Sequence, residues 1–122
     1  MKKTINTVQE LLKTLNLEDE NQIDWFYVSL YLKLSESLID KYADKVDWDW
    51  ISRWQKLSES FIERHKDKVD WYCVSKYQNL SEDFIEKHFN KFTIKDIITY
   101  QNVSDEFLIK HIKDVRKLCT NA

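Results

Sequence analysis

Apolar and polar residues follow one another along this chain in a pattern that repeats every 23 residues. In residues 47–69, Trp48, Ile51 and Trp54 recur at intervals of three, which is typical of one face of a short helix. After a polar break, a second apolar group that begins with Phe61 and Ile62 continues with helical spacing. The pattern therefore predicts two short helices in each copy of the repeat.

Capping residues mark where these helices begin. Asp47 precedes the first helix and Ser58 precedes the second, and the side chain of each can accept hydrogen bonds from first-turn N–H groups. Glu59 follows Ser58 in the first turn, where a negative charge favours the positive end of a helix. The other copies have equivalent pairs at Asp24 and Ser35, Asp70 and Ser81, and Thr93 and Ser104.

Four copies follow one another without a linker, at residues 24–46, 47–69, 70–92 and 93–115. Helices of about two turns are marginal in water, so packing between neighbouring copies must stabilise them. A fixed period of this length is typical of a repeat array. We therefore expect an all-α fold, a small α-solenoid of 23-residue helix-turn-helix repeats with divergent terminal repeats.

The whole chain, residues 1–122, is expected to form a single repeat domain. Residues 1–23 are interpreted as a degenerate N-terminal capping repeat, because Ile5, Val8 and Leu11 keep the register of the copies. The last copy, residues 93–115, is divergent, and residues 116–122 are expected to form a tail.

Positions that recur in every copy are expected to build the core. These positions are Trp25/Trp48/Trp71, Val28/Ile51/Val74/Ile97, Tyr31/Trp54/Tyr77/Tyr100, Leu34/Leu57/Leu80/Val103, and the pairs Leu38–Ile39, Phe61–Ile62, Phe84–Ile85 and Phe107–Leu108.

Composition excludes several classes of function. The chain has no glycine, so it has no glycine-dependent phosphate-binding loop. Its net charge is −2 with the signs interleaved, whereas phosphate-backbone binding depends on concentrated Lys and Arg. No apolar run approaches the roughly 20 residues that span a bilayer. Residues 1–20 lack the uninterrupted apolar stretch of a signal peptide, so we expect none. Cys73 and Cys119 are too far apart for a metal knuckle, which favours reduced thiols and a cytoplasmic location.

Recurrent polar residues are better explained by structure than by chemistry. The four capping serines have no recognisable His–Asp partners, and Gln55, Gln78 and Gln101 are expected to form hydrogen bonds along the stack. His65, His88 and His111 share a position with Tyr42. Equivalent positions in stacked helices lie about 8–10 Å apart, whereas zinc ligands lie about 2 Å from one metal. We therefore predict no catalytic, metal or cofactor site, and no enzymatic activity.

Positions that differ between the copies are the candidates for binding a partner. On the first helix of each copy they form one face, with residues of the types enriched in binding hot spots. The candidate residues are Phe26, Tyr27, Leu30, Asp49, Trp50, Arg53, Tyr72 and Lys76.

In the first copy this face is apolar, at Phe26, Leu30 and Leu32. The favoured explanation is that the N-terminal helix covers it. The alternative is an exposed hydrophobic patch that binds a partner.

The copies share the core string D-W-x-x-[VI]-S-x-[YW]-Q-x-L-S-E-x-F-I-[ED]-[KR]-[HY], and residues 24–115 carry the likeness to it. It resembles short tandem repeats in uncharacterised proteins of bacteriophages, giant viruses and some bacteria. The resemblance implies a helical repeat and a viral or mobile-element origin, and it carries no functional residues over to this chain.

The preferred functional hypothesis is a non-enzymatic protein-protein interaction module whose partner is a host or viral protein. Its specific form is an inhibitor of a host defence protein, anti-CRISPR-like, that acts by steric occlusion in the cytoplasm of the host cell. One alternative is single-stranded nucleic-acid binding, because aromatic residues are interleaved with Lys and Arg. Another is self-assembly into a homo-oligomer, in which Cys119 could crosslink copies of the chain.

Overall fold

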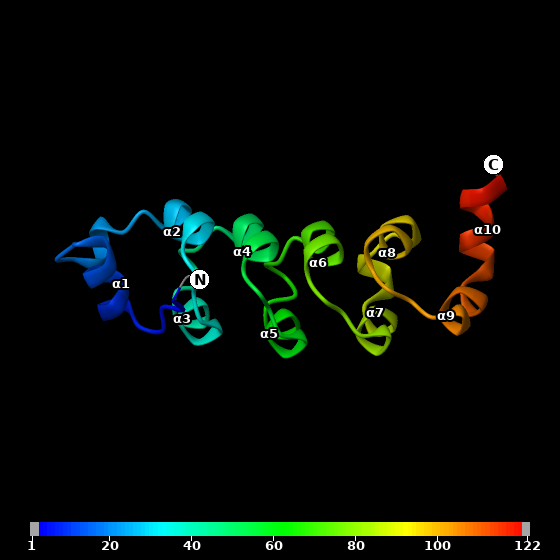
Figure 1. Ribbon diagram of the computed structural model, residues 1–122, viewed down its shortest axis with the longest axis horizontal. Coiled ribbons are helices and arrows are strands. Elements are labelled where there is room, and N and C mark those ends of the chain that lie inside the picture. Colours follow the sequence, from blue (N-terminus) through cyan, green and yellow to red (C-terminus); the bar gives the residue numbers. More distant parts are fainter. Residues whose placement is uncertain (1–2, 121–122) are drawn as a thin grey trace. The chain divides into compact units, whose positions relative to one another are not determined.

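The computed structural model describes residues 3–120, which are all-α apart from one isolated β-bridge (Figure 1). The chain forms two compact units, unit 1 at residues 1–69 and unit 2 at residues 70–122. The boundary falls between the second and third copies of the repeat, so each unit contains two copies.

Unit 1 contains the N-terminal segment and the first two helix pairs. The first copy of the repeat forms α2 and α3, the second forms α4 and α5, and α2 packs against α4 (Figure 1). The elements are α1 (Val8–Leu15), η1 (Glu20–Gln22), α2 (Trp25–Tyr31), α3 (Glu36–Lys41), α4 (Trp48–Trp54) and α5 (Glu59–Arg64).

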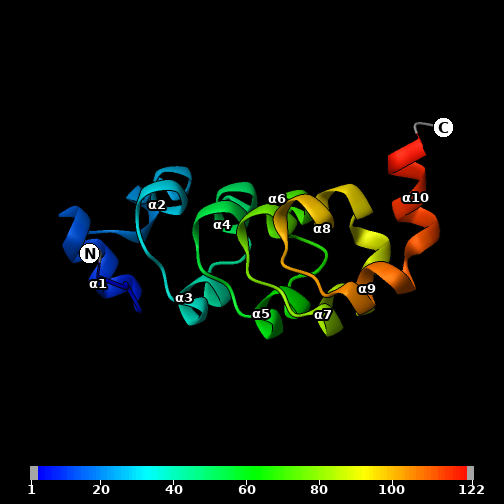
Figure 2. The same ribbon diagram turned by 45° about the vertical axis from the view of Figure 1, so that its right-hand side comes forward.

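Unit 2 contains the other two helix pairs and a C-terminal helix. Helix α6 packs against α8, and α10 packs against both α8 and α9 (Figure 2). The elements are α6 (Trp71–Tyr77), α7 (Glu82–Lys87), η2 (Phe89–Lys91), α8 (Ile94–Tyr100), α9 (Asp105–Lys110) and α10 (Ile112–Thr120). Successive helix pairs thus pack within each unit, which confirms the predicted all-α class of small helical repeats.

Every predicted cap is confirmed. The side chain of each capping residue accepts a hydrogen bond from the backbone N–H three positions later, at 3.0 to 3.2 Å. Thr7 caps α1 in the same way, with Glu10 N–H as the donor at 3.1 Å. Because these bonds depend only on residues close in sequence, the starts of the helices follow from local chemistry.

The core consists mainly of the aliphatic residue in the middle of each first helix and the apolar pair in each second helix. Val28, Ile51, Val74 and Ile97 are completely buried. The second-helix pairs are buried as predicted, except that Leu108 in the last copy is half-buried. Trp25, Trp48 and Trp71 are also half-buried, at the edge of the core.

One set of predicted core residues is wrong. Tyr31, Trp54, Tyr77 and Tyr100 are 50%, 54%, 38% and 36% exposed. An α-helix turns about 100° per residue, so each interval of three residues falls about 60° short of a full turn. In α4, Trp54 therefore lies about 120° around the helix from Trp48, and only Ile51 between them faces the core directly.

The N-terminal segment does not keep the register of the copies. Helix α1 runs without a break through residues 9–12, where the register of the copies places the connection between two helices. Before it, Ile5 forms a parallel β-bridge with Leu34: Ile5 N–H donates to Lys33 O at 2.8 Å, and Ser35 N–H donates to Ile5 O at 2.9 Å. Residues 3–23 therefore cap the first copy by backbone pairing and by burying Ile5, Val8 and Leu11.

The predicted tail is also different in the structure. Residues 116–120 belong to α10, and residues 121–122 lie outside the described residues. Ile112 and Val115 lie three residues apart on this helix, and Val115 is half-buried where α10 packs in unit 2. No helix within residues 3–120 is long and apolar enough to cross a lipid bilayer.

Candidate functional site

Recurrent glutamines join one copy to the next. Gln55, from the second copy, accepts a hydrogen bond from Leu34 N–H at 2.9 Å and donates to Leu32 O at 2.6 Å. Gln101, from the fourth copy, accepts from Leu80 N–H at 3.3 Å and donates to Gln78 O at 2.9 Å. The predicted bonding along the stack is confirmed for these two glutamines.

The capping serines also bond to the preceding copy. Glu36 accepts hydrogen bonds from Ser58 N–H at 2.6 Å and from the Ser58 hydroxyl at 2.8 Å. Glu82 bonds to Ser104 in the same way, at 2.6 and 2.9 Å. Each hydroxyl thus caps its own helix and bonds to a carboxylate of the neighbouring copy.

A buried serine provides a further connection. Ser29 is fully buried in α2, where its hydroxyl donates to Trp25 O at 2.6 Å and accepts from Asp47 N–H at 3.0 Å. Asp47 is the cap of the second copy. The hydrogen bond therefore fixes the start of α4 against α2.

The histidine position is occupied by side chains that bond to an acidic residue of the preceding segment. His65 Nε2 lies 2.6 Å from Asp40 Oδ1, and His111 Nε2 makes the equivalent short contact with Glu86 Oε1. Tyr42, at the same position in the first copy, donates to Glu20 Oε1 at 2.8 Å. Within residues 3–120, no three side chains of His, Cys, Asp and Glu are grouped to hold a metal ion.

These pairs shift the pKa values of their members. Burial tends to raise the pKa of Asp40, but hydrogen bonds from His65 and Arg64 lower it on balance. The pKa of Glu86 is lowered first by its hydrogen bond with His111 and further by Lys110, against a smaller effect of burial. The pKa of Tyr42 is raised by its hydrogen bond to the Glu20 carboxylate. Both lowered carboxyl groups are therefore stabilised in their charged form.

A different set of residues forms an exposed aromatic surface on unit 1. Phe26, Tyr27 and Tyr31 come from α2, and Phe26 and Tyr27 are 54% and 48% exposed. Half-buried Trp50 and exposed Trp54 come from α4. Together with Arg53, these residues make up what we call the unit 1 aromatic surface.

The rings of this surface hold one another in place. Phe26 meets Trp50 edge-on, with ring centres 6.1 Å apart, and Tyr27 packs on Tyr31 at 4.8 Å. Trp50 stacks on Trp54 at 6.4 Å. The Arg53 guanidinium lies 5.6 Å from the Trp50 ring and 5.1 Å from the Trp54 ring, within the range of cation–π attraction. The contacts between α2 and α4 make one continuous surface from two copies.

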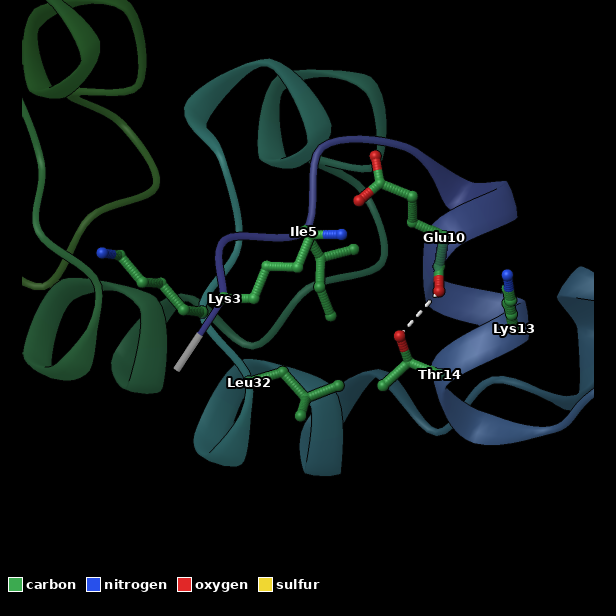
Figure 3. Close-up of a pocket in the computed structure, with 7 residues that line it drawn as sticks. Lys3, Ile5, Glu10, Lys13, Thr14 and Leu32 are labelled. Carbon is green, nitrogen blue, oxygen red and sulfur yellow. Dashed lines mark hydrogen bonds between the residues drawn. The ribbon is translucent and has the colours of Figure 1, made fainter. Parts of the chain in front are cut away.

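The favoured explanation for the apolar face of the first copy is wrong for Phe26, which the N-terminal segment leaves exposed. The segment shields the face only in part, since Leu30 and Leu32 are half-buried. Beside Leu32 it leaves a pocket of 610 Å³, also lined by Ile5 and by Lys3, Lys13 and Lys33. Figure 3 shows α1 on one side of this pocket, with the Thr14 hydroxyl donating to Glu10 O at 2.8 Å.

Unit 2 has its own aromatic group around Tyr72 and Lys76. The Tyr72 and Tyr100 rings meet edge-on at 6.2 Å, and their hydroxyl oxygens lie 3.3 Å apart. That hydrogen bond raises the pKa of Tyr72. Lys76 Nζ lies 5.3 Å from the Tyr77 ring and 5.4 Å from the Tyr100 ring, and its pKa is raised chiefly by a hydrogen bond with Tyr77. Tyr72 and Lys76 thus come together with the two recurrent tyrosines of this unit.

The structure brings the predicted candidates together in two sets, one in each unit. In unit 1, Phe26, Tyr27, Trp50 and Arg53 lie on the aromatic surface, whereas Asp49 is exposed on α4. The exposed recurrent aromatics Tyr31, Trp54, Tyr77 and Tyr100 are not among the predicted candidates, because recurrence in every copy indicates burial as readily as exposure. The spacing of four residues from Tyr27 to Tyr31 and from Trp50 to Trp54 was the available signal, since such pairs share a helix face.

Comparison with known proteins finds no matching family model, no matching curated protein and no matching solved structure.

Proposed function

We propose that this protein is a non-enzymatic interaction module that binds a protein partner through the unit 1 aromatic surface. The observation that supports it most is the exposure of Phe26, Tyr31 and Trp54, at 54%, 50% and 54%, on two adjacent helices. Contiguous exposed apolar patches on monomeric proteins commonly mark interaction sites. Several recurrent polar residues of unit 1, by contrast, already bond one copy to the next.

The physical character of the surface suits a protein partner. Trp, Tyr and Arg are the residue types most enriched in hot spots of protein interfaces. Because Trp50 and Trp54 are stacked and Arg53 lies over both rings, these side chains lose little rotamer freedom when a partner binds. Asp49, Lys33 and Lys56 are exposed charged residues on the same two copies, where they can form a polar rim around an apolar centre.

The finer proposal is inhibition of a host defence protein by steric occlusion. It rests on the resemblance of the repeat to proteins of phages and giant viruses. Occlusion requires only that the module cover a functional surface of its target, so a protein without catalytic residues suffices. In this proposal the module acts in the cytoplasm of the host cell.

The test is affinity capture from a lysate of the native host, with the full-length chain immobilised. The wild type is compared with Trp54→Ala and with the control Leu118→Ala, which truncates a similarly exposed apolar residue on α10. We expect a protein that the wild type and Leu118→Ala retain and that Trp54→Ala loses. Retention of the same proteins by all three chains would contradict the proposal.

Single-stranded nucleic-acid binding is the second candidate, because Arg53 lies over two exposed or half-exposed rings that could stack on bases. The net charge of −2 and pI of 5.9 oppose it. Binding to phosphates releases counterions, so affinity for an oligonucleotide would fall steeply with salt. A salt titration of complex formation separates the candidates, since a largely apolar protein interface responds weakly to salt.

A further inference from the structure

A groove lies on unit 1 between two aromatic side chains that occupy the same position in successive copies. It has a volume of 260 Å³ and is lined by Tyr31 and Trp54, by the half-buried Leu30 and Leu32, and by Lys33 and Lys56. It forms part of the unit 1 aromatic surface and adds two lysines to it.

We propose that this groove binds a proline-rich segment of the partner in the polyproline II conformation, with an acidic residue of that segment beside the lysines. The inference rests on the proposed function, since it names the chemistry of the partner that the same surface would bind.

The packing of two successive copies favours this conformation. Helices α2 and α4 pack against each other, and packed helices lie about 8–10 Å apart. Tyr31 and Trp54 are the last residues of these helices, so from helix packing we expect the two rings to recur at about that interval. A polyproline II helix advances about 9 Å in each turn of three residues. A β-strand repeats its side chains on one face every 7 Å or so, and an α-helix repeats every 5.4 Å or so. The polyproline II repeat falls within that range, whereas a two-residue step of a strand and a single turn of an α-helix are both shorter.

The lining of the groove fits the same ligand. Proline-rich segments are recognised in aromatic-lined grooves, and their conformation exists before binding, so little entropy is lost. A polyproline II backbone has no internal hydrogen bonds, so its carbonyl groups remain able to accept hydrogen bonds from a binding surface. Half-buried Leu30 and Leu32 provide apolar surface between the two rings.

Charge distinguishes this groove from the equivalent positions of unit 2. Lys33 and Lys56 occupy one position of the first two copies, and the same position holds Asn79 and Asn102 in the last two. Both lysines are exposed at the groove. A ligand with Asp or Glu next to its proline repeat is therefore favoured on unit 1, although each exposed ion pair contributes little.

The experiment is a titration of the full-length protein, followed by NMR of the indole N–H signals of its five tryptophans. The Trp54 signal is assigned by its loss in Trp54→Phe. The first probe is a peptide with proline at every third residue, alanine between the prolines and glutamate at both ends. The second has the same length and the same residues in another order, with its prolines two residues apart in one stretch and the remaining alanines after them. The third probe is oligo(dT).

We expect the first peptide to shift the Trp54 signal and to bind more tightly than the second. Trp54→Ala and Tyr31→Ala should each weaken binding of the first peptide, by about 30-fold where the ring is a hot spot. Lys56→Ala should weaken it by about two- to fivefold, and Leu118→Ala should leave it unchanged. Far-UV circular dichroism checks that each variant is folded, and Tyr31→Ala serves if Trp54→Ala is not.

Equal binding of the two peptides would overturn the inference, because the repeat of the ligand would then not matter. If neither peptide binds but Trp54→Ala still loses the captured protein, the groove inference is wrong and the proposed function stands. If only oligo(dT) shifts the Trp54 signal, and Trp54→Ala captures the same proteins as the wild type, both proposals fail.

Discussion

At the scale of single residues, the Gln55 side chain satisfies backbone hydrogen-bonding groups of the preceding copy. The connection between α2 and α3 has backbone groups that no helix or sheet satisfies, and the Gln55 side chain pairs with Leu34 N–H and Leu32 O. Gln55 is only 5% exposed. Removing its side chain would therefore leave buried backbone groups without a partner, which costs more than the bond itself contributes.

Gln55→Ala is expected to lower the free energy of unfolding by about 1–3 kcal/mol, measured by urea denaturation. Gln101→Ala removes equivalent bonds at a half-buried position, where water can replace them, so the loss should be smaller. Lys56→Ala, at the exposed residue next to Gln55, is the control and should change stability by less than about 0.5 kcal/mol. A loss for Gln55→Ala no larger than for the control would contradict this role.

Asp40 and Glu86 make stability depend on pH in the acid range. Each has a pKa in the folded protein below its ordinary value of 3.8 or 4.5, so the unfolded chain binds more protons at a given acid pH. Their contribution to the free energy of unfolding is complete above the ordinary pKa values. It is lost as the pH falls through the lowered pKa values of the folded protein. The thermal unfolding midpoint should therefore fall as the pH drops below about 4.

The double variant Asp40→Asn, Glu86→Gln tests this assignment, because neither amide titrates. Its midpoint at neutral pH should be lower than that of the wild type, and its further decline in acid should be shallower. Melting curves recorded by circular dichroism from neutral to acid pH give the comparison. An equally steep decline in both proteins would show that other groups control the acid response.

At the scale of elements, the helices are too short to be stable alone. Helices of six or seven residues lie well below the length at which an isolated helix persists in water. Each is stabilised at its start by a cap and along one side by the neighbouring copy. Ser58 serves both purposes, because it caps α5 through Phe61 N–H and bonds to Glu36 of the preceding copy.

Ser58→Ala is expected to reduce the free energy of unfolding by about 1–2 kcal/mol, since it removes the cap and a hydrogen bond to Glu36. Ser60→Ala is the matched control, because it removes the contact between the Ser60 and Ser58 hydroxyls, 3.2 Å apart, but leaves the cap and the bonds to Glu36 in place. Guanidinium unfolding of the two variants should separate them clearly. Equal stabilities would mean that the capping bond contributes nothing measurable.

The elements also show what the sequence could predict. The helix pairs, their caps and the fully buried residues followed from local patterns such as Ser58 before Phe61–Ile62. The N-terminal cap did not, because Ile5 pairs with residues 33–35 through backbone groups that carry no side-chain signal. The exposure of Trp54 does not follow from the sequence pattern. Residues three apart share a helix face approximately, but residues six apart, such as Trp48 and Trp54, lie about 120° apart around the helix.

Only part of the candidate site could be predicted from the sequence. Phe26, Trp50 and Arg53 were identified from differences between copies, and the structure brings them together. Tyr31 and Trp54 recur, so comparison of the copies assigned them to the core. Comparison of the copies separates recurrent positions from variable ones. It does not show whether a recurrent residue is buried, as Val28 is, or exposed, as Tyr31 is.

At the scale of the whole molecule, the fourth copy lacks two kinds of residue that bond a copy to its successor within a unit, such as Ser29 to Asp47 and Glu86 to His111. Ile98 stands where the earlier copies have a buried serine, and Ile109 stands where they have the acidic partner of histidine. Both isoleucines are exposed. A further copy stacked on the fourth would therefore find neither hydrogen bond, which disfavours continued self-stacking.

In the proposed function, the residues that stabilise the fold differ from those that bind the partner. Trp54→Ala should cost only about 1 kcal/mol of stability, because an exposed stacked pair contributes about that much. Phe61→Ala, in the core, should cost about 3–5 kcal/mol. The pair of variants distinguishes a surface aromatic from a core aromatic in neighbouring helices of one copy.

The most direct test of the proposed binding surface is the affinity of folded Trp54→Ala for the protein captured by the wild type, measured by calorimetry. We expect affinity to fall by about 30-fold or more while the circular dichroism spectrum stays that of the wild type. Unchanged affinity in a folded Trp54→Ala protein would contradict the claim that the unit 1 aromatic surface binds the partner.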